Sequence, residues 1–237
     1  QAEDGIRDVL LSLVGSEMCI RDSPKSMLGE AQRQWLIDTA GSSDATWQVI
    51  VSSTPLVIPV GPPEARDGWA SGGAATGYSR ELQGIIDDLR AAGVVNVIWL
   101  SADVHFATFF RHQIDEGYEI FEAIAGPLNA KVFPVPEFDD YLTSERLFMH
   151  PERGDMTSFD AALKWFNFGL VEIDASGQAV VRYVDATGRD LWDVTLPVRK
   201  RPRAPAVRCS VGPRVLRRAV QPPPAAARII SPQIQAA

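Results

Sequence analysis

The stretch from Val94 to Phe106 constrains the fold most, because a buried strand leads there directly into two side chains of the kind that bind metals. Residues Val94 to Leu100 are almost all β-branched or apolar. A nearly continuous apolar run predicts a strand that is buried on both faces of a sheet. Asp103 and His105 follow after two small residues. Ligand sites of α/β sheets collect at the carboxyl ends of strands, so we expect the chemistry of the chain here.

Asp103 and His105 have two interpretations. In an extended chain, residues i and i+2 point to the same side, so the carboxylate and the imidazole are expected to reach one metal site. Alternatively, Asp103 caps the following turn and His105 is a core histidine bonded to backbone. An isolated Asp-x-His pair is a weak signal that needs structural context. The spacing thus gives a hypothesis in which Asp103 and His105 are catalytic and metal-binding residues.

Flanking segments supply context, because they match one family in the same order. The segment NVIWLSADVH resembles the Gly-Asp-Val-His motif of the alkaline phosphatase D (PhoD-like) metallophosphatases, with Ala102 in place of the usual glycine. The segment MLGEAQRQWLIDTA, which begins at Met27, resembles an upstream block of that family. Three further segments also match: Asp67-Gly68-Trp69, Gly77-Tyr78 with Arg80, and Phe121-Glu122 with Gly126 to Ala130. The resemblance extends over residues 27 to 198.

The resemblance implies an α/β fold, a calcineurin-like metallophosphatase sandwich with α-β-β-α layers. The chain would hold only its C-terminal portion and end in an antiparallel β meander. The implied activity is metal-dependent hydrolysis of small phosphate monoesters and diesters. The implied cofactor is a binuclear metal site with Fe³⁺ and Ca²⁺, or with Zn²⁺, at which Asp103 and His105 are the last two ligands. His105 would bind through one nitrogen and need a hydrogen-bond acceptor for the other.

The family's earlier ligands, a set of Asp residues and an Asn-His pair, have no counterpart before Met27. We therefore expect a fragment that is inactive alone. The resemblance also implies that the parent protein is exported to the periplasm or the medium, although no signal peptide is recognised in this chain. Two other functions stay open: another calcineurin-like phosphodiesterase, and a non-catalytic β-sandwich module that binds through the strands from Phe166 onward. A bound metal would argue against the second.

The charge of the chain excludes one class of partner. The formal net charge is −7, but nine of the 23 basic residues follow Pro197, where no acidic residue occurs. The preceding part therefore has 14 basic and 30 acidic residues, a net charge of −16. A body this acidic is not expected to neutralise a nucleic-acid backbone. No apolar run of about 20 residues indicates a membrane span, and the oligomeric state is not indicated.

Both ends differ from the middle. Residues 14 to 23, VGSEMCIRDS, resemble a translated sequencing adapter, so we expect residues 1–23 to be non-native and residues 24–198 to form the domain. A signal-like segment around residues 6 to 14 is the alternative. Residues 199–237 are rich in Arg, Pro and Ala, and we expect a disordered or frameshifted tail with few contacts. Cys19 and Cys209 lie in these ends, so the domain has no thiolate site.

Periodicity and turn residues predict the elements between the ends. We expect helices over 30–39, ended by Gly41, and over 79–92, ended by Gly93. We expect strands over 48–52, 94–100, 106–111, 118–123, 166–173, 179–185 and 191–196, with the last three as an antiparallel meander and the first two in a largely parallel sheet. The stretch from 126 to 153 is expected to be irregular, with His150 at the surface. Trp69, on a loop rich in Pro and Gly, is a candidate for stacking on a ligand.

Overall fold

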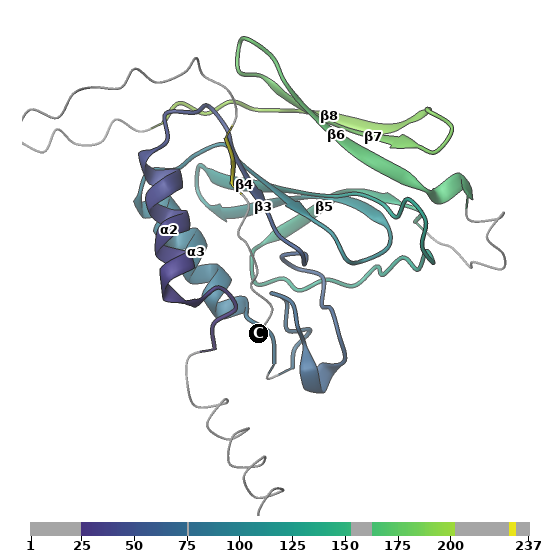
Figure 1. Ribbon diagram of the computed structural model, residues 1–237, viewed down its shortest axis with the longest axis horizontal. Coiled ribbons are helices and arrows are strands. Elements are labelled where there is room, and N and C mark those ends of the chain that lie inside the picture. The colour runs from purple at the N-terminus through teal and green to yellow at the C-terminus, as the bar shows by residue number, and fades with distance from the viewer. Residues whose placement is uncertain (1–24, 75, 153–162, 202–227, 231–237) are drawn as a thin grey trace, which may run out of the picture.

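The computed structural model describes residues 25–74, 76–152 and 163–201 and the backbone of 228–230. Helices α2 (Gly29–Ser42) and α3 (Ser79–Ala91) lie side by side on one face of a six-stranded sheet, and a three-stranded antiparallel sheet lies over the other face (Figure 1). The fold is therefore mixed α/β. Its layers are α-β-β, and no second helical layer occurs within these described ranges.

The six-stranded sheet is mixed. Strands β9, β1, β2 and β4 run parallel, whereas β3 pairs antiparallel with both β4 and β5. The expected parallel crossover is confirmed, because β1 leads through α3 into its parallel neighbour β2. The order across the sheet is β5-β3-β4-β2-β1-β9. The strands are β1 (Gln48–Val51), β2 (Val97–Ser101), β3 (Ala107–Asp115), β4 (Tyr118–Ile124), β5 (Ser144–His150) and β9 (Arg228–Ile230).

Strand β2 is buried on both faces, as its apolar run predicts. Val97 and Trp99 belong to the core beneath the helices, whereas Ile98 belongs to the core beneath the antiparallel sheet. The strand begins at Val97 rather than Val94, because Asn96 adopts a left-handed backbone with φ of 56°.

Helix α3 follows an amphipathic pattern. Its apolar residues Leu82, Ile85, Ile86 and Leu89 are buried, and Gly93 follows the helix with φ of 70°. Helix α2 extends beyond its predicted end, so Gly41 lies inside it rather than after it. A Cβ atom at Gly41 would lie 3.3 Å from Cβ of Ala92. The glycine therefore permits close approach of the two helices. The loop after β1 contains one short 3-10 helix, η1 (Pro63–Ala65).

The predicted antiparallel meander is confirmed. It consists of β6 (Asn167–Ile173), β7 (Ala179–Asp185) and β8 (Asp190–Leu196), preceded by the 3-10 helix η2 (Leu163–Trp165). The Tyr183 hydroxyl donates to the Thr108 carbonyl at 2.8 Å and joins the meander to β3. The Trp192 ring packs at 5.3 Å from Phe109 and at 5.1 Å from Phe148, so the meander covers the β3 and β5 side of the sheet.

The expectation that the chain makes few contacts from Arg199 onward is wrong for the residues that the structure describes. Arg199 forms an ion pair of 2.7 Å with buried Glu119. The Arg201 guanidinium donates to the carbonyls of Gly41, Ser43 and Ala92, at the carboxyl ends of both helices. Strand β9 pairs in parallel with β1. Residues 1–24, including the adapter-like segment, lie outside the described residues.

Candidate functional site

The five-residue loop from Ala102 to Phe106 joins β2 to β3 and carries both predicted site residues. It lies at the edge of the sheet where the parallel strands end. There Ser101, the last residue of β2, pairs with Ile124 of β4, and Ala107, the first residue of β3, pairs with His150 of β5. Asp103 and His105 therefore lie just past the carboxyl end of β2, as the sequence predicts.

The backbone of this loop differs from the extended chain that the sequence argument assumed. Asp103 has φ of 73° and His105 has φ of 56°, so both residues are left-handed. Side-chain alternation at i and i+2 does not apply, because the strand ends at Ser101. Left-handed residues other than glycine cost free energy and cluster at functional sites, although Asp and His tolerate the conformation better than most.

Apolar side chains anchor the loop between its polar ones. Val104 and Phe106 are buried, whereas Asp103 is exposed and His105 is half-buried. Neither polar side chain lies in a closed apolar core. The alternative interpretation, in which His105 is a core histidine, would have placed its ring there. Within the described ranges, the Asp103 carboxylate has no hydrogen bond or ion pair. The loop is thus anchored by its buried apolar residues, and its Asp103 carboxylate is exposed to solvent.

His105 is oriented by its backbone partner. Its Nδ1 lies 2.7 Å from the carbonyl oxygen of Lys131, and its ring centroid lies 4.8 Å from that of Phe133. A carbonyl oxygen can only accept, so Nδ1 carries the proton and Nε2 of the neutral ring keeps its lone pair. This is the acceptor that a metal-binding histidine requires for its other nitrogen. The contact therefore fixes the ring in a form that can ligate through Nε2.

The donor types fit part of a metal site but not all of it. A carboxylate and an imidazole suit iron or zinc, and further oxygen donors would suit calcium. Among the described residues, however, no group of three or more His, Cys, Asp and Glu side chains is placed to hold a metal ion. Asp103 and His105 therefore form at most a share of a centre, and their convergence on one ion stays a prediction.

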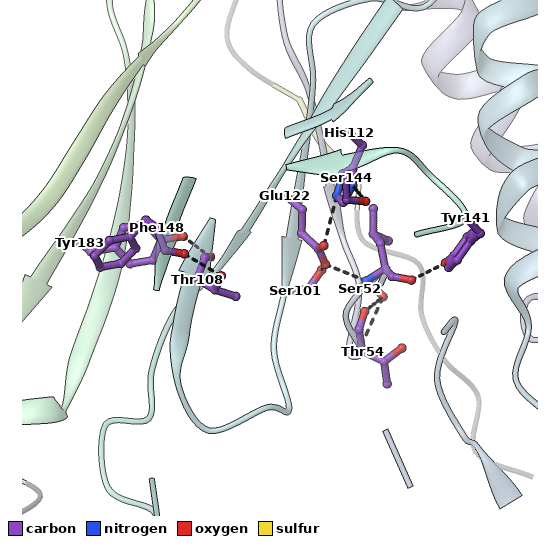
Figure 2. A network of polar contacts seen from close by, with 11 residues as sticks. Ser52, Thr54, Ser101, Thr108, His112, Glu122, Tyr141, Ser144, Phe148 and Tyr183 are labelled. Atoms are coloured by element: carbon purple, nitrogen blue, oxygen red, sulfur yellow. Dashed lines mark hydrogen bonds and ion pairs between the residues drawn. The ribbon is translucent and has the colours of Figure 1, made fainter. Parts of the chain in front are cut away.

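A buried polar network includes Ser101, the residue directly before this loop (Figure 2). Its centre is Glu122 of β4, whose side chain is fully buried. Glu122 accepts hydrogen bonds from the Ser101 hydroxyl and from the Leu56 backbone N–H, and it lies 3.3 Å from Nε2 of His112. Glu122 lies in a segment that matches the family, but the sequence alone predicted no role for it. The available signal was a carboxylate within the otherwise apolar run of β4.

The Pro- and Gly-rich loop after β1 joins the same network, and here one expectation is wrong. Trp69 is a core residue with 2 % exposure, and its indole N–H donates to the Ser52 hydroxyl at 3.0 Å. It is therefore not available to stack on a ligand. The Tyr141 hydroxyl donates to the Leu56 carbonyl, and burial, followed by the charge of Glu122, raises the pKa of that phenol.

His150 was expected at the surface within an irregular stretch, but it ends strand β5 and is half-buried. Burial lowers the pKa of its imidazole, since the charged form loses hydration. The strand was missed because β5 is an edge strand, where polar residues such as Glu145 and Arg146 interrupt the apolar pattern. The third histidine of the chain, His112, is fully buried in β3.

Comparison with known proteins agrees with the motifs. The family model described as PhoD-like phosphatase matches residues 13–183, a span that begins one residue before the adapter-like segment and includes the loop. Alkaline phosphatase D of Bacillus subtilis (strain 168) is 28% identical over 90 residues, which cover 36% of this chain and 14% of that protein. The matched region is thus a small part of the length of this relative. In the described part of the chain, no helix has the length and apolar character needed to span a membrane.

Proposed function

Because the chain belongs to the PhoD-like phosphatase family, we propose that it supplies one share of the active site of a metal-dependent phosphoesterase. The substrates would be small phosphate monoesters and diesters. The observation that carries the proposal is the loop at the end of β2, where His105 is held with Nε2 free and the Asp103 carboxylate is exposed. Family membership favours this enzyme over a non-catalytic binding module.

The geometry of the loop supports a ligand role for Asp103 and for His105. Asp103 would offer a carboxylate oxygen, and His105 would offer Nε2 while Lys131 holds its Nδ1 proton. Fe³⁺ with Ca²⁺, or Zn²⁺, would lower the pKa of a bound water and neutralise charge on the reacting phosphate. The Lys131 contact holds the His105 ring in one orientation, which reduces the reorganisation that this ligand would need on binding.

The remaining ligands would come from a longer parent protein, which we propose to be exported and to fold as a calcineurin-like sandwich. Two β layers already face each other in the described residues. Between them lies an open apolar groove of about 390 Å³, whose lining includes Val49, Leu100 and Val171. Leu170, which also lines the groove, and Phe168 lie on the edge strand β6 and are 38 % and 40 % exposed. These features support further strands next to β6 in the parent protein.

The reaction is tested with the 237-residue chain and a longer gene product that contains it. Each is supplied with Fe³⁺, Zn²⁺ and Ca²⁺ and assayed with p-nitrophenyl phosphate and bis(p-nitrophenyl) phosphate. We expect metal-dependent turnover by the longer protein, lost on chelation, and no turnover by the 237-residue chain above that of its Asp103→Ala, His105→Ala double variant. Absence of any phosphoester hydrolysis by the longer protein would refute the proposed function. Turnover by the short chain would show that its own residues complete the site.

A further inference from the structure

Glu122 is the most deeply buried carboxylate of the described residues, and its side chain contacts three segments: the loop after β1, the end of β2, and β3. Its Oε1 accepts from the Leu56 N–H and from the Ser101 hydroxyl, both at 2.7 Å. Leu56 belongs to the loop that follows β1, and Ser101 is the last residue of β2. One oxygen atom therefore ties the loop after β1 to the last residue of β2, and Figure 2 shows Glu122 beside Ser101.

The second carboxylate oxygen faces β3. Glu122 Oε2 lies 3.3 Å from His112 Nε2, within ion-pair distance but without the alignment of a hydrogen bond. His112 Nδ1 lies 2.7 Å from the Ser144 hydroxyl at the start of β5. Both side chains of the Glu122–His112 pair are fully shielded from solvent. Glu122 is thus linked, directly or through His112, to each of the strands that surround it.

A buried carboxylate is costly, and apolar residues of similar size often replace buried ion pairs with no loss of stability. Stability alone therefore does not account for a charge at this position. What the carboxylate does provide is acceptor capacity for two donors that an apolar side chain would leave unpaired. One of these donors, Ser101, is the residue directly before the loop that carries the candidate site.

We infer that Glu122 is a positioning residue for the loop from Ala102 to Phe106, an inference that rests on the proposed function of that loop. Two left-handed residues persist only where the surrounding structure fixes them. Phe106 anchors one end of the loop in the core, and the hydrogen bond to Ser101 fixes the other end. Glu122 itself does not touch Asp103 or His105. It acts by holding Ser101, and it fixes the spacing between this loop and the loop after β1.

The inference is tested by NMR on the 237-residue chain, which requires no activity. The variants are Glu122→Leu, which removes the acceptor, Glu122→Gln, which keeps an oxygen for Leu56 and Ser101, and Ser101→Ala, which cuts only the link to the site loop. The control is Glu119→Leu, because Glu119 lies at the opposite end of the same strand, is buried and is paired with Arg199. The readouts are amide exchange of Leu56 and the ring ¹⁵N shifts of His105.

We expect Glu122→Leu to accelerate Leu56 amide exchange at least tenfold relative to its neighbours, and to mix the His105 tautomers. Glu122→Gln should keep Leu56 exchange within about threefold and retain one tautomer. Ser101→Ala should mix the His105 tautomers while Leu56 stays protected, and it decides the question if Glu122→Leu does not fold. Glu119→Leu should lower the melting temperature without changing either readout. A single His105 tautomer in Ser101→Ala, or equal changes in the Glu119 control, would overturn the inference. An inactive longer enzyme would instead refute the proposed function alone.

Discussion

The Nδ1 atom of His105 lies 2.7 Å from the Lys131 carbonyl oxygen, across 26 residues of sequence. This contact determines which ring nitrogen can face a metal. We predict that the neutral ring of His105 carries its proton on Nδ1. In ¹⁵N NMR spectra recorded above the titration range of the ring, Nδ1 should give a pyrrole-like shift and Nε2 a pyridine-like shift. A proton on Nε2 would contradict the proposed ligand role.

The left-handed backbone at Asp103 gives a prediction for stability. Glycine adopts φ of 73° without a steric clash, whereas the Cβ atom of alanine comes too close to the backbone at this angle. Asp103→Gly should therefore be more stable than Asp103→Ala by about 1 kcal/mol. Both variants lack the carboxylate, so the comparison isolates the backbone. The measurement is the free energy of unfolding in urea, and a more stable alanine variant would show that the loop is not left-handed there.

Arg201 gives a prediction about the end of the domain. Its guanidinium binds the carboxyl ends of both helices, where a positive charge is favourable. Arg201→Ala should lower the free energy of unfolding by about 1 kcal/mol, a shift of roughly 2–4 °C in melting temperature for a domain of this size. The matched control is Lys200→Ala, at an exposed neighbouring position. Equal stability of the two variants would show that Arg201 does not stabilise the domain.

His150 gives a prediction for the pH dependence of stability. Burial lowers the pKa of its imidazole from 6.5 in the folded state, so the unfolded chain takes up a proton first as the pH falls. Titration of His150 therefore leaves the free energy of unfolding unchanged well above pH 6.5 and lowers it once the pH falls below that value. The loss of stability between pH 7.5 and 5.5 should be smaller in His150→Gln than in the parent chain. An unchanged or larger loss would mean that the folded pKa is not lowered.

The parts of this structure that could be predicted from sequence are those set by local patterns. The apolar run of β2, the amphipathic face of α3 and the turns of the meander each specify their element without help from distant residues. The position of Asp103 and His105 follows from the end of β2. The left-handed loop does not, because its conformation depends on where Val104 and Phe106 find the core.

Contacts between distant residues account for what sequence reasoning missed. The role of Glu122 depends on partners 66 and 21 residues away, and Arg201 reaches carbonyls 109 to 160 residues earlier in the chain. No periodicity reports such contacts. The edge strand β5 was not predicted for a different reason. It pairs on one side only, so polar residues are tolerated in it and interrupt the apolar pattern that would indicate a strand.

The most direct test of the proposed metal site compares two histidines at the same edge of the sheet in the longer, metal-loaded protein. His105 is the proposed ligand. His150 pairs across the sheet with Ala107, which follows His105 by two residues, and it has no proposed role in the reaction. The measurement is kcat/KM for p-nitrophenyl phosphate. We predict that His105→Ala lowers it by roughly 100-fold or more, with loss of bound metal, because even the partners of metal ligands typically matter by about 10–100-fold. His150→Gln should stay within about threefold of the parent. Activity and metal content of His105→Ala equal to those of the parent would show that His105 is not a metal ligand.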